Sequence, residues 1–109
     1  ADLFLMPSLY EPCGLTQMRA QRYGAIPVAR RVGGLADTIE DGVTGFLFDE
    51  YTPDSLELAV HRAIDQYEDP PAWQLLVHEA MPRDFGWARS AAKYLELYRR
   101  VIEARPAAR

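Results

Sequence analysis

The chain of 109 residues has the length of one small domain, and its composition of 49% hydrophobic and 26% charged residues excludes disordered and collagen-like classes. The formal net charge of −4 argues against a protein that binds the phosphate backbone of nucleic acids. The single cysteine excludes an internal disulfide, and no apolar run approaches the ~18 residues that a membrane span needs. We therefore expect a cytoplasmic protein with neither nucleic-acid nor membrane partners.

Three short apolar runs predict the strands of a parallel sheet, at residues 2–6, 26–30 and 45–48. None of them alternates polar with apolar residues, which is typical of strands with both faces covered. A helix is expected over 14–23, closed by Gly24, and residues 31–44 are expected to be a loop. The first two strands and their helix predict a right-handed βαβ unit.

Three helices are predicted after the third strand. Thr52 suits the N-cap of the first, Pro53 suits its first turn, and an apolar face runs from Leu56 to Tyr67. The segment 69–71 contains two prolines and should stop it, and a shorter helix is expected over 72–80.

The last predicted helix covers 86–104 and carries an apolar stripe with Trp87, Tyr94 and Tyr98, a spacing typical of packing in a core. Residues 105–109 are expected to form a frayed tail, so that 1–104 make up the folded part. Three strands are few for a doubly wound sheet, so we expect part of a larger α/β domain with an unpaired sheet edge.

The densest chemical signal is the segment that joins the first strand to its helix, Pro7-Ser8-Leu9-Tyr10-Glu11-Pro12-Cys13-Gly14-Leu15-Thr16-Gln17. It lies at the carboxyl edge of the sheet, where open α/β sheets bind ligands. Pro12 keeps Glu11 out of helical geometry, Gly14 allows close approach to a ligand, and the free amides that follow suit a phosphate. A carboxylate beside a phosphate-binding site can accept hydrogen bonds from the hydroxyls of a sugar that is joined to the phosphate. A tight turn with a solvated Glu11 explains the same residues equally well.

A second glycine-containing segment, Val32-Gly33-Gly34-Leu35-Ala36-Asp37-Thr38, follows the second strand at the same edge. Paired glycines permit close approach to a ligand, although a plain turn is the common alternative. We expect Asp37 to cap or orient this loop rather than to bind a divalent ion. His61 and His78 have no partners at zinc-ligand spacing, so no metal site is expected.

Both segments, together with the sequences that surround Gly24 and Gly86, closely resemble bacterial glycogen synthases and plant starch synthases. The resemblance implies the later half of the Rossmann-like C-terminal domain of a retaining GT-B glycosyltransferase, a short parallel sheet flanked by helices. It further implies transfer of glucose from ADP-glucose to the non-reducing end of an α-1,4-glucan, without a cofactor.

By the same resemblance, Glu11 is the catalytic residue and contacts the hydroxyls of the donor glucose. The other implied donor-site residues are Cys13 and Gly14 in the sugar pocket, the amides of Leu15 and Thr16 at the distal phosphate, and Gly33 and Gly34 at the interdomain cleft. Related transferases hold the nucleotide ribose with a second glutamate eight positions after the first. Arg19 stands there in this chain, so that contact is not implied.

The resemblance also implies partners outside these residues, namely the nucleotide sugar, the glucan and an N-terminal domain of the same protein. It implies too that the helix over 86–104 packs across the junction between the domains, which would leave part of its surface exposed in this chain. The cationic side chains that bind the leaving phosphates in the family lie upstream, so we expect the 109-residue chain to be inactive by itself. The alternatives are a UDP- or GDP-sugar transferase of the same fold and a non-catalytic nucleotide-binding remnant.

Overall fold

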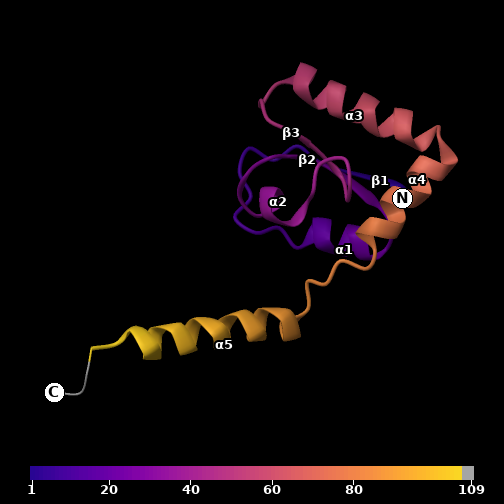
Figure 1. The fold of residues 1–109 in the computed structure, drawn as a ribbon. Helices are drawn as coiled ribbons and strands as arrows, with labels where there is room; N and C mark the ends of the chain where they lie inside the picture. Colours follow the sequence, from indigo (N-terminus) through magenta and orange to yellow (C-terminus); the bar gives the residue numbers. More distant parts are fainter. Residues whose placement is uncertain (107–109) are drawn as a thin grey trace.

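The computed structural model describes residues 1–106 and contains a short parallel sheet flanked by helices, as expected (Figure 1). The strands β1 (Leu3–Met6), β2 (Ile26–Arg30) and β3 (Phe46–Phe48) lie in the order β1-β2-β3. Leu3 pairs with Ile26 and Val28 with Phe46 in a parallel register. The helices are α1 (Thr16–Arg22), α2 (Gly33–Thr38), α3 (Pro53–Tyr67), α4 (Pro70–Ala80) and α5 (Trp87–Ala104).

Both faces of the sheet are covered at β2 and β3, which explains the unbroken apolar runs of these two strands. On one face, alternate strand residues such as Val28 and Phe46 pack against α3 and α4. On the other face, Ala29 and Leu47 pack against Leu35 of α2. Figure 1 shows α3 on the side of the sheet opposite α1 and α2.

The helix α2 corrects the prediction of a continuous loop over 31–44. Its six residues start with two glycines, which have poor helix propensity. Tertiary packing stabilises α2 despite this low propensity, because Leu35 is fully buried in the core and Ile39, just after the helix, is also buried.

The helices α1 and α4 each start two residues away from the predicted position. Helix α1 begins at Thr16 instead of residue 14, because Gly14 adopts a φ of 72°, which is incompatible with a right-handed helix. Helix α4 begins at Pro70 instead of residue 72. The two prolines that were expected only to stop α3 instead occupy the first turn of α4, where no amide needs an intrahelical acceptor.

The predicted capping residues are confirmed. The Thr52 hydroxyl accepts a hydrogen bond from the Ser55 amide at 3.2 Å and caps α3. Gly24 ends α1 with a φ of 82°, and its amide donates to the Gln21 carbonyl at 3.0 Å.

Helix α5 extends away from the rest of the molecule (Figure 1). None of its residues is buried, and the Trp87 side chain is 83% exposed. The prediction from its spacing that the stripe packs in a core is therefore wrong for this chain, whereas the exposed helix surface that the resemblance implies is found. The predicted tail lies partly outside the described residues. None of the described helices is long and apolar enough to cross a bilayer.

The unpaired sheet edge is confirmed. Within the described residues β1 pairs only with β2, and Leu5 on β1 remains 52% exposed.

Candidate functional site

The two glycine-containing segments lie in direct contact at the carboxyl edge of the sheet. The Gly34 amide donates a hydrogen bond to the Glu11 carbonyl at 2.9 Å. A Cβ atom added at Gly33 would lie 2.8 Å from the Glu11 carbonyl carbon, and one added at Gly34 would lie 2.5 Å from the Cys13 carbonyl carbon. A real Cβ atom essentially never lies closer than 3.0 Å to a heavy atom outside its own residue and chain neighbours. The close packing of the two segments therefore requires glycine at positions 33 and 34.

Side chains from the two helices complete this contact. The amide nitrogen Nε2 of Gln17 donates to the Cys13 carbonyl at 2.9 Å and to Oγ1 of Thr38 at 3.0 Å. The Thr38 hydroxyl in turn donates to the Gly34 carbonyl at 2.7 Å. Gln17 is fully buried in α1, whereas Thr38 is half-buried and Cys13 is exposed, so a partly buried hydrogen-bonded path joins the two segments.

The predicted donor-site residues occur together in these two segments, and several remain accessible. Glu11, Gly14 and Gly33 are half-buried and Gly34 is buried, whereas Cys13, Leu15 and Thr16 are exposed. Within residues 1–106, the Glu11 carboxylate has no hydrogen-bond or ion-pair partner, and the amides of Leu15 and Thr16 have no acceptor. The carboxylate and the amides are therefore free to contact a ligand.

Position 14 requires glycine for a different structural reason. Its φ of 72° lies in the left-handed region, and a Cβ added there would lie 2.9 Å from the Gln17 amide carbon and nitrogen. The turn therefore needs the glycine both for its backbone conformation and for the buried glutamine.

The expectation that Asp37 orients the glycine loop is wrong. Asp37 is exposed and makes no hydrogen bond to that loop within the described part of the chain, whereas Thr38 does. No side-chain role was predicted for Gln17 or Thr38. The available signal was their spacing, because Gln17 and Thr38 each lie four residues after the carbonyl that they bind, one helical turn away.

Arg30, at the end of β2, was also not predicted. Its guanidinium donates to the Leu9 carbonyl at 2.6 Å and to the Asp49 carbonyl at 3.2 Å, and it lies 5.4 Å from the Tyr51 ring centroid. It therefore ties the segment just before Glu11 to the loop that follows β3.

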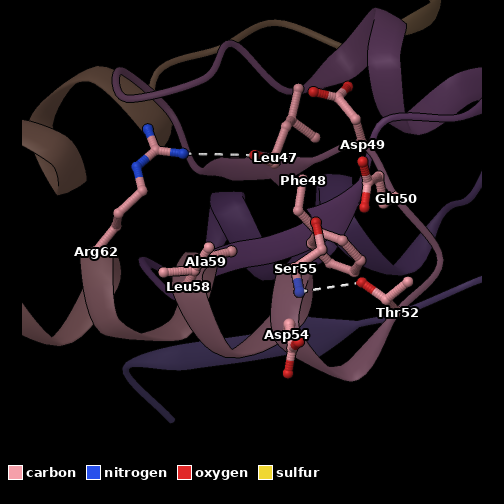
Figure 2. Close-up of a pocket in the computed structure, with 10 residues that line it drawn as sticks. All are labelled: Leu47, Phe48, Asp49, Glu50, Thr52, Asp54, Ser55, Leu58, Ala59 and Arg62. Atoms are coloured by element: carbon pink, nitrogen blue, oxygen red, sulfur yellow. Dashed lines mark hydrogen bonds between the residues drawn. The ribbon is translucent and has the colours of Figure 1, made fainter.

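A pocket of about 500 Å³ lies elsewhere, between β3 and the first turns of α3 (Figure 2). Its lining includes the carboxylates of Asp49, Glu50 and Asp54, which disfavour a phosphate ligand. Arg62 is its cationic side chain, and that guanidinium already binds Asp41 at 3.0 Å and the Leu47 carbonyl at 3.4 Å. The pocket therefore does not fit the predicted anionic donor. No group of three or more potential metal ligands occurs among residues 1–106.

Comparison with known proteins gives one consistent family. The model of the glycosyl transferases group 1 family matches residues 1–74. A glycogen synthase from Anaeromyxobacter sp. (strain K) is 59% identical over 104 residues, covering 91% of this chain and 22% of the relative. The chain thus spans about a fifth of the length of the curated relatives that it matches.

Solved structures agree. The catalytic domain of starch synthase IV from Arabidopsis thaliana, bound to ADP and acarbose, superimposes with a TM-score of 0.84 at 42% identity, covering 94% of this chain and 23% of that one. HepE from Anabaena in complex with UDP-glucose gives a TM-score of 0.62 at 30% identity, covering 74% of this chain and 22% of that one.

Proposed function

The chain belongs to the glycosyl transferases group 1 family, and from this membership we propose that it is the donor-binding portion of a glycogen synthase. The complete enzyme would transfer glucose from ADP-glucose to the non-reducing end of an α-1,4-glucan. The fold is the one expected for part of the C-terminal domain of a GT-B glycosyltransferase.

One observation carries this proposal. The Glu11–Cys13 backbone packs directly on Gly33 and Gly34, and among residues 1–106 the same segment carries an unpaired carboxylate at Glu11 and unpaired backbone amides at Leu15 and Thr16. This arrangement offers hydrogen-bond acceptors for sugar hydroxyls beside hydrogen-bond donors for phosphate oxygens. A nucleotide sugar carries both groups on adjoining atoms.

The chemistry that these residues would supply follows from glucosyl transfer. The transition state places positive charge on the sugar ring and negative charge on the departing phosphate. We assign the Glu11 carboxylate to the hydroxyls of the donor glucose, and the amides of Leu15 and Thr16 to the distal phosphate. Cys13 and Gly14 would line the sugar pocket, and Gly33 and Gly34 would form the glycine loop that faces the interdomain cleft. No cofactor or metal is required by these roles.

The exposure of the site supports a larger enzyme in which another part of the protein covers and completes it. Cys13, Leu15 and Thr16 are exposed at an open edge, and water at that edge would weaken each electrostatic contact to the donor. We propose that an N-terminal domain of the same protein closes this side and supplies the remaining phosphate and glucan contacts. The 109-residue chain alone would then lack synthase activity. Its single cysteine fits a cytoplasmic enzyme.

The experiment is a segment exchange. The matching segment of the Anaeromyxobacter glycogen synthase, 59% identical, is replaced by this chain, and glucan extension is measured with ADP-glucose and with UDP-glucose. We expect kcat/KM with ADP-glucose within about tenfold of the parent enzyme, since the exchanged segment keeps the loops and the sheet. The host enzyme without the segment and the 109-residue chain alone serve as inactive controls.

Two results would overturn the proposal. One is a chimera that unfolds cooperatively like the parent enzyme but extends no glucan. The other is a chimera that has gained a preference for UDP-glucose, which would favour the UDP-sugar transferase alternative that the HepE neighbour represents.

A further inference from the structure

We infer that Gln17 and Thr38 act as a positioning pair that fixes the Glu11 segment against the glycine loop, an inference that rests on the proposed function of Glu11. The two residues come from different helices, 21 positions apart, and touch through their side chains. Neither contacts the donor in the proposed site. Their role is to hold the backbone from which Glu11 projects.

The hydrogen bonds form a closed ring through both segments. The Glu11 carbonyl accepts from the Gly34 amide, and the Gly34 carbonyl accepts from the Thr38 hydroxyl. The amide nitrogen Nε2 of Gln17 donates to the Thr38 hydroxyl and to the Cys13 carbonyl, and Cys13 lies two residues after Glu11, which closes the ring. The Glu11–Cys13 backbone is thus held at both ends, so Glu11 cannot shift relative to Gly34 without breaking a bond.

The chemistry of the ring fixes the direction of each bond. The Cys13 carbonyl only accepts, so the Gln17 atom that faces it must be the amide nitrogen. Thr38 donates its one proton to the Gly34 carbonyl, so its lone pair accepts from Gln17. Both hydrogens of the Gln17 amide are therefore used, and no substitution of Gln17 by an acceptor reproduces them.

The cost of keeping this glutamine supports a specific role. Gln17 is fully buried, and its Oε1 has no hydrogen-bond partner within the described residues. A buried acceptor without a partner is destabilising, and an apolar side chain of similar size would avoid that cost. Packing alone therefore does not account for an amide here, whereas its two donated bonds do.

The test is made in the glycogen synthase chimera and uses two substitutions that change the ring at nearly constant side-chain volume and one that keeps the hydroxyl of the ring. Thr38→Val removes the hydroxyl, Gln17→Glu places an acceptor against the Cys13 carbonyl, and Thr38→Ser retains the hydroxyl. Thr44→Val is the matched control, because the Thr44 hydroxyl likewise accepts a hydrogen bond, from the Glu40 amide, but lies outside the ring; Thr44 is buried and Thr38 is half-buried.

We expect Thr38→Val and Gln17→Glu to lower kcat by about 10- to 100-fold, because a displacement near 1 Å can cost ~100-fold in rate. The KM for ADP-glucose should change less than kcat, because the phosphate-binding amides stay in place. Thr38→Ser should restore most of kcat, and Thr44→Val should leave it near the parent value even though it lowers stability.

Hydrogen exchange in the 109-residue chain gives a readout independent of activity. Thr38→Val should accelerate exchange of the Gly34 amide, which bonds to the Glu11 carbonyl, and Thr44→Val should not. Unchanged protection of that amide, or unchanged kcat in both ring variants, would overturn the positioning role. An inactive unsubstituted chimera would overturn the proposed function instead, so the two failures are distinguishable.

Discussion

A single added methyl group at Gly34 tests the packing of the two loops most directly. Gly34 is buried at the start of α2, and an added Cβ would lie 2.5 Å from the Cys13 carbonyl carbon. Ordinary van der Waals contact begins at 3.4 Å, and the Cys13 carbonyl oxygen and Cα lie closer to the added Cβ than the carbonyl carbon does, so the backbones must separate by more than the roughly 0.9 Å between 2.5 and 3.4 Å. Both contacting groups are backbone, so no side-chain rotation relieves the overlap.

The expected size of the effect follows from this displacement. Overpacking of a folded interior costs roughly 1–3 kcal/mol. A misplacement near 1 Å at a reacting centre can lower the rate by ~100-fold. We therefore expect Gly34→Ala to lower kcat/KM of the chimera by about two orders of magnitude while the protein still folds.

The assay compares Gly34→Ala with Gly42→Ala, measuring glucan extension in the chimera and urea unfolding in the 109-residue chain. Gly42 has a φ of 77° but nothing within 4 Å of an added Cβ. Its substitution should cost about 1–2 kcal/mol of backbone strain without loss of activity. Parent-like activity of Gly34→Ala, or an equal loss in Gly42→Ala, would refute the reasoning.

Three further substitutions or truncations have defined expectations. Glu11→Gln in the chimera should lower kcat by about 10²–10³-fold, as expected for an electrostatic contact to the reacting sugar, whereas Glu57→Gln on the exposed face of α3 should be neutral in the same assay. Thr52→Ala removes the cap of α3 and should lower the free energy of unfolding of the 109-residue chain in urea by about 1 kcal/mol, whereas Thr52→Ser should keep the cap. Equal unfolding midpoints for the unsubstituted chain and both variants would contradict the cap. Truncation after Gly86 should change the free energy of unfolding by less than about 0.5 kcal/mol, because no residue of α5 is buried, and a larger loss would show that α5 packs on the rest of the chain.

The sheet and most of the helices were predictable because their signals are local. Strands with two covered faces need apolar residues at every position, and β2 and β3 are buried along almost their full length. The Thr52 cap and the Gly24 turn each depend on neighbours within five residues. Such signals can be read from the chain without knowledge of the tertiary structure.

Helix α2 was not predictable from local signals, because its glycines have low helix propensity and Leu35 is buried only once β2 and β3 are in place. The same limit applies to the site. The loops and their glycines are visible in the sequence, whereas the bond between Gln17 and Thr38 joins positions that only the fold brings together.

Helix α5 shows a different limit. An amphipathic stripe indicates that a helix face needs cover, but it does not indicate which surface supplies that cover. In α3 the cover is the sheet, and Ala59 and Ala63 are buried against it. In α5 the segment after Met81 leads the helix away from the sheet, so Tyr94 and Tyr98 remain more than half exposed. An 18-residue helix without packing is only marginally stable in water, so the stripe of α5 has a physical reason only if another surface covers it.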